Sequence, residues 1–241
     1  MTEQENGQFP AFERVLMVSA HPDDPDFGAA GTLARLARAG SKVTIVVCTD
    51  GSEGGEDPAV ADSELTQRRY AEQREAAAQM GADDVVFLGH PDGRLAHTLE
   101  FRREITALIR RHRPNLVLTH VPAIDLSSPI GGYHPDHLAV GQATLAAVYP
   151  ASRNPRAVRE LLDEGLEPWR VKEVWIPTWT QGEFFVDITD TMDSKIAALR
   201  CHQSQFANWP DWEKGMRERQ ETIGKKAGMK YAEGFKRIEI A

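Results

Sequence analysis

Cysteine, basic charge and long apolar runs are all scarce in this sequence. Only two cysteines occur, Cys48 and Cys201, which excludes a disulfide framework and a cysteine-rich zinc site. Acidic residues outnumber basic ones by 36 to 28, and the resulting net charge of -8 disfavours a nucleic-acid partner or an electrostatic membrane anchor. Residues 1–10 lack the basic and apolar segments of a signal peptide, and no run is long enough to span a bilayer. We therefore expect a cytoplasmic protein.

What the sequence does have is a regular alternation of short apolar runs and helical patterns. Apolar runs predict strands at 14–19, 43–48, 84–88 and 115–119. Between and after them, the patterns predict helices at 28–39, 63–80, 99–112 and 138–148. Four successive strand–helix repeats indicate an α/β fold with a mostly parallel sheet and helices on both faces. The length of 241 residues suits one such domain.

The last third of the chain gives weaker signals. Residues 150–170 are rich in proline and charge, and predict an insertion with a short helix. A strand is predicted at 173–176, an edge strand at 184–188 and a helix at 190–203. Residues 208–241 are highly charged, and we predict a charged tail with no assigned place in the fold.

One histidine and several aspartates lie in the turn between the first predicted strand and helix. In a parallel sheet this turn lies at the carboxyl edge, where ligands bind. His21 and Asp24 suit a first-row metal, and Asp23 between them is placed to act on a metal-bound water. The alternative is that the aspartates only cap the helix. A second cluster, Tyr133–His137, also precedes a helix, and two such clusters disfavour the capping alternative.

Both clusters resemble motifs of the PIG-L/LmbE-like N-acetylglucosaminyl deacetylases, which include the mycothiol and bacillithiol pathway deacetylases. The family's Ala-His-Pro-Asp-Asp stands here as Ala20–Asp24, and its His-Pro-Asp-His as His134–His137. Weaker matches cover most of the chain, at Cys48–Gly51, Arg69 with Glu72, Phe87–Gly89, Pro91–Gly93, Asp187–Asp190, Lys195 and His202–Gln205. The resemblance implies a single LmbE-like deacetylase domain over 1–241, a Rossmann-like sheet and a zinc site at the carboxyl edge of its strands.

The resemblance also implies roles for the motif residues. The implied metal ligands are His21, Asp24 and His137. Asp23 is then the general base, and His134 stabilises the oxyanion or acts as the acid. Three protein ligands and an open position are typical of catalytic zinc, and Fe²⁺ suits the same nitrogen and oxygen ligands. We also expect a catalytic pair in which Asp136 raises the pKa of His134 and favours an imidazolium near neutral pH.

Four further residues are candidates for supporting roles. Arg69 and Asp92 are candidates to bind sugar hydroxyls, with a surface ion pair or a turn as the alternative. His120 ends a strand and is a candidate for substrate contact, or else a histidine satisfied by its surroundings. His202 is a candidate to orient Asp23 or a metal ligand without binding the metal itself, and the alternative is that it only caps a helix end.

The predicted function is that of a metal-dependent hydrolase that removes an acetyl or other acyl group from an N-acetylglucosamine-type conjugate. Metal-activated water attacks the amide in this reading. The alternatives are an amidase acting on a thiol-sugar conjugate and a non-catalytic metal-binding member of the fold. A dinucleotide-dependent dehydrogenase is disfavoured, because the first turn lacks Gly-x-Gly-x-x-Gly. We expect a small-molecule substrate whose pocket is shaped by loops 50–62 and 121–133, no nucleic-acid or membrane partner, and a chain that is compatible with a homo-oligomer.

Overall fold

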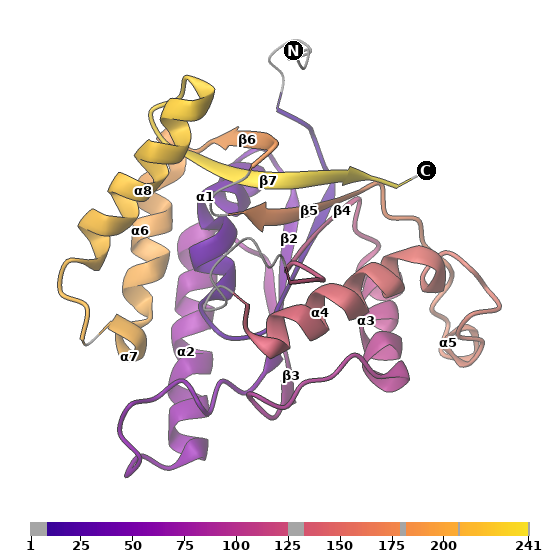
Figure 1. Cartoon of the computed structure of the whole chain (residues 1–241). Coiled ribbons are helices and arrows are strands. Elements are labelled where there is room, and N and C mark those ends of the chain that lie inside the picture. The colour runs from indigo at the N-terminus through magenta and orange to yellow at the C-terminus, as the bar shows by residue number, and fades with distance from the viewer. Residues whose placement is uncertain (1–8, 125–132, 179–181, 207, 241) are drawn as a thin grey trace.

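A seven-stranded sheet runs through the protein, in the order β3-β2-β1-β4-β5-β7-β6 (Figure 1). The computed structural model describes residues 9–124, 133–178, 182–206 and 208–240. The strands are β1 Arg14–Ser19, β2 Lys42–Thr49, β3 Asp84–His90, β4 Leu116–Thr119, β5 Glu173–Thr178, β6 Phe184–Asp187 and β7 Ala232–Glu239. The first five strands pair in parallel, and β7 is antiparallel to both β5 and β6. The predicted α/β class with a mostly parallel sheet is confirmed.

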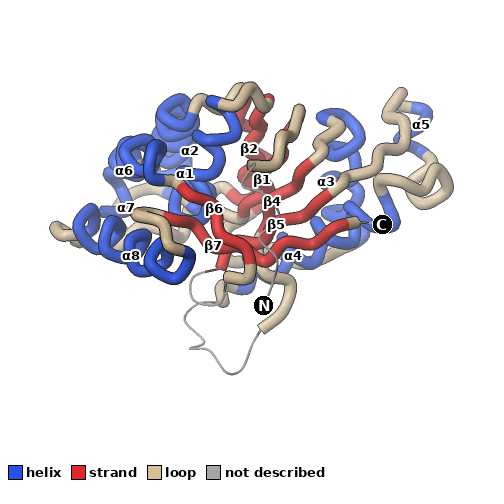
Figure 2. Tube along the Cα trace, turned by 90° about the horizontal axis from the view of Figure 1, so that it is seen from above, coloured by secondary structure: helices blue, strands red, loops and turns tan. Residues whose placement is uncertain are grey.

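Helices cover both faces of the sheet, as Figure 2 shows from above. One face carries α1 Asp24–Arg38, α2 Asp62–Met80, α6 Met192–Cys201, α7 Gln203–Phe206 and α8 Trp212–Ala227. The other face carries α3 Leu99–His112, α4 Pro135–Ala146 and α5 Glu160–Asp163. A π-helical turn, Ala147–Ala151, follows α4, and a 3₁₀ turn, Thr189–Thr191, precedes α6. Within the described residues, no helix has the length and apolar character needed to cross a membrane.

The central strands are apolar on both sides because each side packs under a helical layer. In β1 the side chains of Val15 and Met17 join the core under α1, while Leu16 and Val18 join the core under α3 and α4. Residues of parallel strands that are buried on both faces form continuous apolar runs rather than alternating ones. This explains why the predictions of β1, β2 and β4 agree with the structure within two residues at each end. The edge strand β3, which is only partly buried, agrees equally well.

Two helices begin earlier than predicted, and both beginnings lie in the motifs. The first helix starts at Asp24 rather than at 28, and α4 starts at Pro135 rather than at 138. Each has a proline in its first two positions and an acidic residue in its first turn. Both features favour a helix N-terminus, because proline needs no hydrogen-bond partner there and the helix dipole attracts a carboxylate. The motif side chains are therefore held by helix starts rather than by free loops.

The structure gives a place in the fold to the charged segment after residue 208, which the sequence analysis left unassigned. Residues 212–227 form α8, and β7 lies between β5 and β6 as an integral strand of the sheet. Phe235 of β7 is fully buried and packs against Trp175 of β5, with ring centroids 5.6 Å apart. Most of the charged side chains lie on the exposed faces of these elements, with Glu233 as a buried exception. As predicted, the segment near 184 is an edge strand, because β6 ends the sheet.

A buried ion pair joins β7 and α6 to the first turns of α1. Lys195 and Glu233 are 0% and 2% exposed, and Lys195 Nζ lies 2.8 Å from Glu233 Oε1. The ammonium also donates to the carbonyl oxygens of Asp26, at 2.9 Å, and Phe27, at 2.7 Å. The carboxylate accepts the backbone N–H groups of Gly31 and Thr32 in the same helix. The last strand thus fixes the helix that carries the first motif.

Candidate active site

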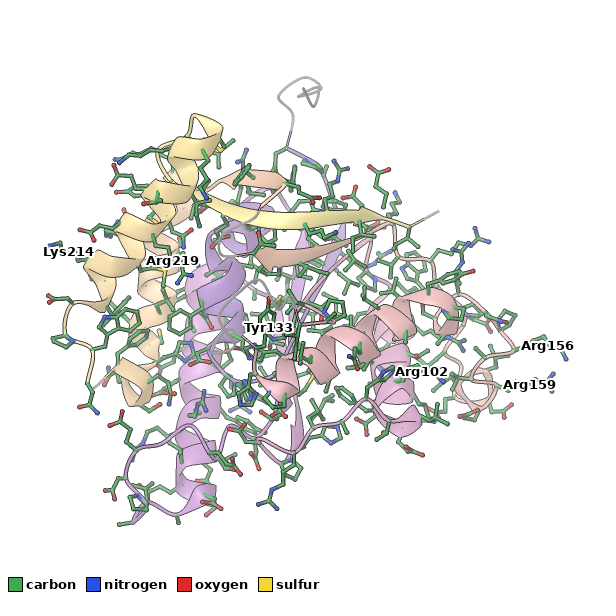
Figure 3. All side chains as sticks on the ribbon, viewed as in Figure 1. Arg102, Tyr133, Arg156, Arg159, Lys214 and Arg219 are labelled. Atoms are coloured by element: carbon green, nitrogen blue, oxygen red, sulfur yellow. The ribbon has the colours of Figure 1, made fainter. Side chains whose placement is uncertain are left out.

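The two motifs meet where the strand order of the sheet reverses. From β1 the chain proceeds to β2 on one side, whereas β4 lies on the other side of β1. Ligands of open α/β sheets bind at such a reversal, outside the carboxyl ends of the strands. His21 follows β1, His120 follows β4, and His134 caps the start of α4. Tyr133 lies beside the first turn of α4 (Figure 3). Residues 125–132, part of the loop predicted to shape the pocket, lie outside the described residues.

Three side chains converge as potential metal ligands. A ligand atom from each of His21, Asp24 and His137 lies within 4.8 Å of the others. His137 Nε2 is 3.1 Å from Asp24 Oδ1 and 3.2 Å from His21 Nδ1. His21 Nδ1 is in turn 3.3 Å from Asp24 Oδ2. Two imidazoles and one carboxylate on one small volume are a typical catalytic zinc donor set.

Two further carboxylates lie behind His21, on its other ring nitrogen. Nε2 is 3.0 Å from Asp92 Oδ1 and 3.2 Å from Asp136 Oδ2. Burial lowers the pKa of His21, but the surrounding carboxylates, Asp136 first, outweigh burial and raise the pKa to about 12. This surplus of negative charge favours a cation at the site, and carboxylates that bond the far nitrogen of a ligating histidine orient it and raise its basicity. The residues present therefore fit a divalent metal.

The expected pairing of Asp136 with the His134 ring is wrong. Asp136 is fully buried, and its carboxylate accepts the N–H groups of Gly93, at 2.8 Å, and Leu95, at 3.0 Å, while it contacts His21. Only the backbone N–H of Asp136 reaches His134, donating to Nδ1 at 3.2 Å. The physical reason is the first turn of α4, which directs the Asp136 side chain into the core and leaves His134 exposed as the N-cap.

The pKa of His134 shifts in the opposite direction from the expected one. Burial, followed by the positive charge of His21, lowers the pKa of His134 below its usual value. Because Nδ1 accepts an N–H, the ring proton belongs on Nε2, the nitrogen left for other partners. The ring lies edge-on to His21, with centroids 4.6 Å apart. His134 can thus donate a hydrogen bond beside the proposed metal ligands.

Asp23 has an unusual backbone and a perturbed carboxylate. Its φ is +93°, in the left-handed region, which costs a residue other than glycine about 1–3 kcal/mol and persists only where the surroundings impose it. Burial, together with the charge of Asp24, raises its pKa to about 6, although Arg69 acts in the opposite direction. Its side chain makes no capping bond to α1, so the alternative that this aspartate only caps the helix is wrong.

Arg69 and Asp92 are buried, so the alternative of a surface ion pair is wrong for both, whereas Asp92 does lie in a turn, as the other alternative had it. Arg69 is 3% exposed and donates to the carbonyl oxygens of Gly51, at 2.8 Å, and Pro22, at 2.7 Å. Asp92 is 5% exposed and faces His21. Both side chains therefore contact residues of the site from the protein interior. Their contact with sugar hydroxyls stays a prediction.

His120 lies directly against the proposed ligands. Its ring stacks on that of His137, with centroids 4.0 Å apart and an angle of 15° between the planes. Its Nε2 accepts the backbone N–H of Ala20 at 3.0 Å and lies 3.3 Å from Asp24 Oδ2. Burial, followed by the charge of His137, lowers its pKa. The structure brings His120 into the site, and its contact with substrate stays a prediction.

His202 supports the site through Asp26 and through Gln73. Its Nε2 bonds Asp26 Oδ2 at 3.0 Å, and the same oxygen accepts Gln73 Nε2 at 3.0 Å. Gln73 Oε1 then accepts the backbone N–H of Asp23 at 2.8 Å. His202, Asp26 and Gln73 are all 0% exposed. His202 is also the C-cap residue of α6, and its backbone N–H bonds the Leu199 carbonyl, so the cap and the supporting contact occur together. No motif or periodicity marked Gln73.

The comparisons with known proteins agree with this geometry. Residues 16–148 match the family model PIG-L, described as GlcNAc-PI de-N-acetylase. The chain is 36% identical over 233 residues to the diacetylchitobiose deacetylase of Thermococcus kodakarensis, an alignment that covers 96% of this chain and 85% of the relative. It is 31% identical over 240 residues to the 1D-myo-inositol 2-acetamido-2-deoxy-alpha-D-glucopyranoside deacetylase of Actinosynnema mirum, covering 82% of each.

A solved structure shows the same fold over almost the whole chain. The N,N'-diacetylchitobiose deacetylase from Pyrococcus horikoshii, complexed with its inhibitor, superimposes with a TM-score of 0.86 at 32% sequence identity. The match covers 95% of this chain and 84% of that one. The similarity therefore includes the C-terminal α8 and β7 region as well as the two motifs.

Proposed function

The chain belongs to the PIG-L family of GlcNAc-PI de-N-acetylases, and from this membership we propose that it is a zinc-dependent N-deacetylase of amino-sugar conjugates. The substrate is an N-acetylglucosamine-type unit attached to a further group, and the products are acetate and the free amine. The observation that carries the proposal is the convergence of two imidazoles and a carboxylate beside a second, raised-pKa carboxylate. Relatives whose names specify deacetylation of such sugars support the same reaction.

The residues proposed to hold the metal are His21, Asp24 and His137. PIG-L deacetylases are generally metal-dependent, and this chain has the corresponding His/Asp/His group. When bound, a divalent metal there supplies Lewis-acid polarisation of the amide carbonyl and lowers the pKa of a water molecule. Zinc suits the mixed nitrogen and oxygen donors, and Fe²⁺ suits the same set. Asp92 and Asp136 orient the His21 ring by bonding its Nε2.

The proposed proton path begins at Asp23. A general base works best when its pKa lies near the working pH, and the pKa of about 6 meets this condition. Asp23 takes a proton from the attacking water as the new C–O bond forms. It then gives that proton to the nitrogen as the C–N bond breaks, and acetate and amine separate. His134 donates a hydrogen bond from Nε2 to the oxygen that gains negative charge, a contribution typical of oxyanion stabilisation.

The two alternatives make different predictions for the same assay. An amidase of thiol-sugar conjugates would hydrolyse the amide that joins the thiol-bearing acyl group to the amino sugar, and would release that group as a carboxylic acid. It would release no acetate from simple N-acetylglucosamine derivatives. A non-catalytic metal-binding protein would release nothing. No specific observation favours the amidase. The non-catalytic alternative is disfavoured, because a purely structural metal site would need neither a carboxylate with a raised pKa nor a hydrogen-bond donor such as His134 beside it.

Acetate release from a panel of N-acetylated glycosides, with zinc and with Fe²⁺ under anaerobic conditions, tests the proposal. The panel holds N-acetylglucosamine, its disaccharide and its conjugate with inositol. We expect acetate and an equal amount of free amine from at least one of them. Failure to cleave any amide, with cleavage of a glycosidic or phosphate bond instead, would overturn the reaction class.

Asp23→Asn tests the role of the base. It keeps the shape of the side chain and removes the basic oxygen, so kcat should fall by about 10² to 10⁴. Metal content and KM should change little. Loss of the metal in this variant would instead make Asp23 a ligand, and full activity would move the base elsewhere, with His134 as the first candidate.

Two broader assignments, of the domain and of the partner, complete the proposal. We assign the whole of 1–241 to one deacetylase domain, a view supported by β7, which belongs to the same sheet as β1. The partner is a small N-acyl amino-sugar, in line with the named substrates of the relatives. Homo-oligomer formation and a cytoplasmic location stay predictions.

A further inference from the structure

The backbone of Asp23 is held by a residue from another helix. Gln73 lies in the middle of α2, fifty residues further along the chain, and its Oε1 accepts the Asp23 N–H at 2.8 Å. Asp23 is one of two non-glycine residues with positive φ in the described part of the chain. Such a conformation persists where the surroundings fix it. The Gln73 amide is an external contact that does so.

The Gln73 amide is itself held in one orientation. Its Nε2 donates to Asp26 Oδ2 at 3.0 Å, and His202 Nε2 bonds the same oxygen at 3.0 Å. A flipped amide would place its oxygen against that carboxylate and its NH₂ against the Asp23 N–H, so both contacts would be lost. Because all three side chains are fully buried, water cannot replace either contact at no cost.

We propose that Gln73 is a positioning residue for the reaction, and that it acts by holding Asp23 in its left-handed conformation. The proposal rests on the proposed function, in which Asp23 is the general base. Asp26 and His202 fix the Gln73 amide, so the three residues act as one support. Without the amide, Asp23 relaxes toward negative φ, and its carboxylate turns away from the water molecule whose proton it would accept.

The metal ligands have anchors that do not depend on Gln73. Asp24 Oδ2 accepts the backbone N–H of His21 at 2.7 Å. The Asp23 carbonyl accepts the N–H groups of Asp26, at 2.9 Å, and Phe27, at 3.0 Å, which fixes the start of α1. Loss of the Gln73 amide should therefore move the base and leave the proposed metal site assembled.

The first test is Gln73→Met, which keeps the length of the side chain and removes both hydrogen bonds. Misplacement of a reacting group by about 1 Å can cost about 10²-fold in rate, so we expect kcat to fall by about 10- to 100-fold. KM should stay within about threefold of the wild-type value, because the variant does not change the contacts that bind the substrate equally in the ground state and the transition state. The amount of metal bound per chain should also be retained. The matched control is Gln220→Met in α8, another glutamine that is only 2% exposed and lies on a different helix. It should leave kcat unchanged.

A double-mutant cycle separates positioning from a general structural effect. If Gln73 acts through Asp23, then Asp23→Asn with Gln73→Met should have the kcat of Asp23→Asn alone. Multiplicative losses in the cycle would overturn the proposal.

The outcomes also distinguish this inference from the proposed function. Wild-type protein that releases no acetate from any N-acetylglucosamine substrate refutes the proposed function. Wild-type activity together with full kcat in Gln73→Met refutes the positioning role alone. Loss of metal in Gln73→Met, in proportion to activity, would likewise overturn the inference, because Gln73 would then support the metal site rather than the base.

Discussion

Removal of the Lys195 ammonium should be among the most destabilising single changes in this fold. Lys195→Met leaves the Glu233 carboxylate, which is 2% exposed, without its counter-ion, and leaves two backbone carbonyls without their donor. Breaking a buried pair by removing one partner costs about 3–5 kcal/mol. For a chain of this length, each kcal/mol lowers Tm by about 2–4 °C, so Tm should fall by about 6–20 °C.

A second substitution should partly reverse this loss. In Lys195→Met with Glu233→Met the uncompensated charge is gone. Phe27 and Gly31, which contact the two members of the pair, are four residues apart on α1, so the freed N–H and carbonyl can bond each other. The double variant should therefore be more stable than Lys195→Met alone, because replacing a whole buried pair by apolar side chains is often close to neutral.

Urea unfolding followed by circular dichroism measures both effects, with a chelator present so that metal binding does not contribute. The control is Lys214→Met, which removes a lysine on the outer side of α8 (Figure 3) that is 77% exposed and should change stability by less than about 0.5 kcal/mol. A loss below about 1 kcal/mol in Lys195→Met, or a double variant less stable than that single variant, would refute the reasoning.

Three further predictions follow from single contacts. Asp136→Asn removes an anionic partner of a proposed imidazole ligand, so zinc affinity measured by competition with a chelator should fall by about 10- to 100-fold; unchanged affinity would contradict this. Burial lowers the pKa of His202, but its carboxylate partner outweighs burial and leaves the pKa raised. Charged His202 therefore stabilises the fold fully below its unfolded pKa of about 6.5 and loses this effect as pH rises through the folded value. The unfolding free energy should fall less between pH 6 and pH 9 in His202→Gln than in the wild type, and equal slopes would refute the assignment. Gly31→Ala places a Cβ 2.8 Å from Ile188 and should cost about 1–3 kcal/mol in urea unfolding, whereas Gly28→Ala, with 3.4 Å of clearance, should cost less; the reverse order would contradict the packing.

Local sequence signals were sufficient for the first half of the fold. The strand at 14–19 was predicted at its observed bounds, and the long helix at 63–80 differs from α2 by one residue. The strand is a continuous apolar run, and the helix has a periodic pattern of apolar residues. Both signals lie within the element itself. The charged segment 208–241 was left unassigned for the opposite reason. Apolar and polar residues alternate near Phe235 and Ile238, but the position of this strand is set by its pairing with β5, more than fifty residues earlier, and the alternation does not specify that partner.

For the site, the sequence by itself determined which side chains are available and where two of the motifs lie. Histidine and aspartate directly after a predicted strand must lie at the carboxyl edge, so His21 and Asp24 could be named as ligand candidates from their positions alone. The resemblance added His137 by motif. In each case the information is contained within a few adjacent residues.

Only the tertiary structure decided what each remaining side chain faces. Asp136 is adjacent in sequence to the proposed ligand His137 and close to His134, yet the turn of α4 directs its carboxylate to His21 instead. Gln73 has no motif, and it acquires a role only because α2 packs beside the turn that contains Asp23. Direction of a side chain depends on helix phase and on packing between distant segments, and neither quantity is fixed by residue type or spacing. The residue types that suggest the chemistry can therefore be identified from short stretches of sequence, whereas the contacts that orient the proposed base and the proposed ligands depend on the tertiary fold.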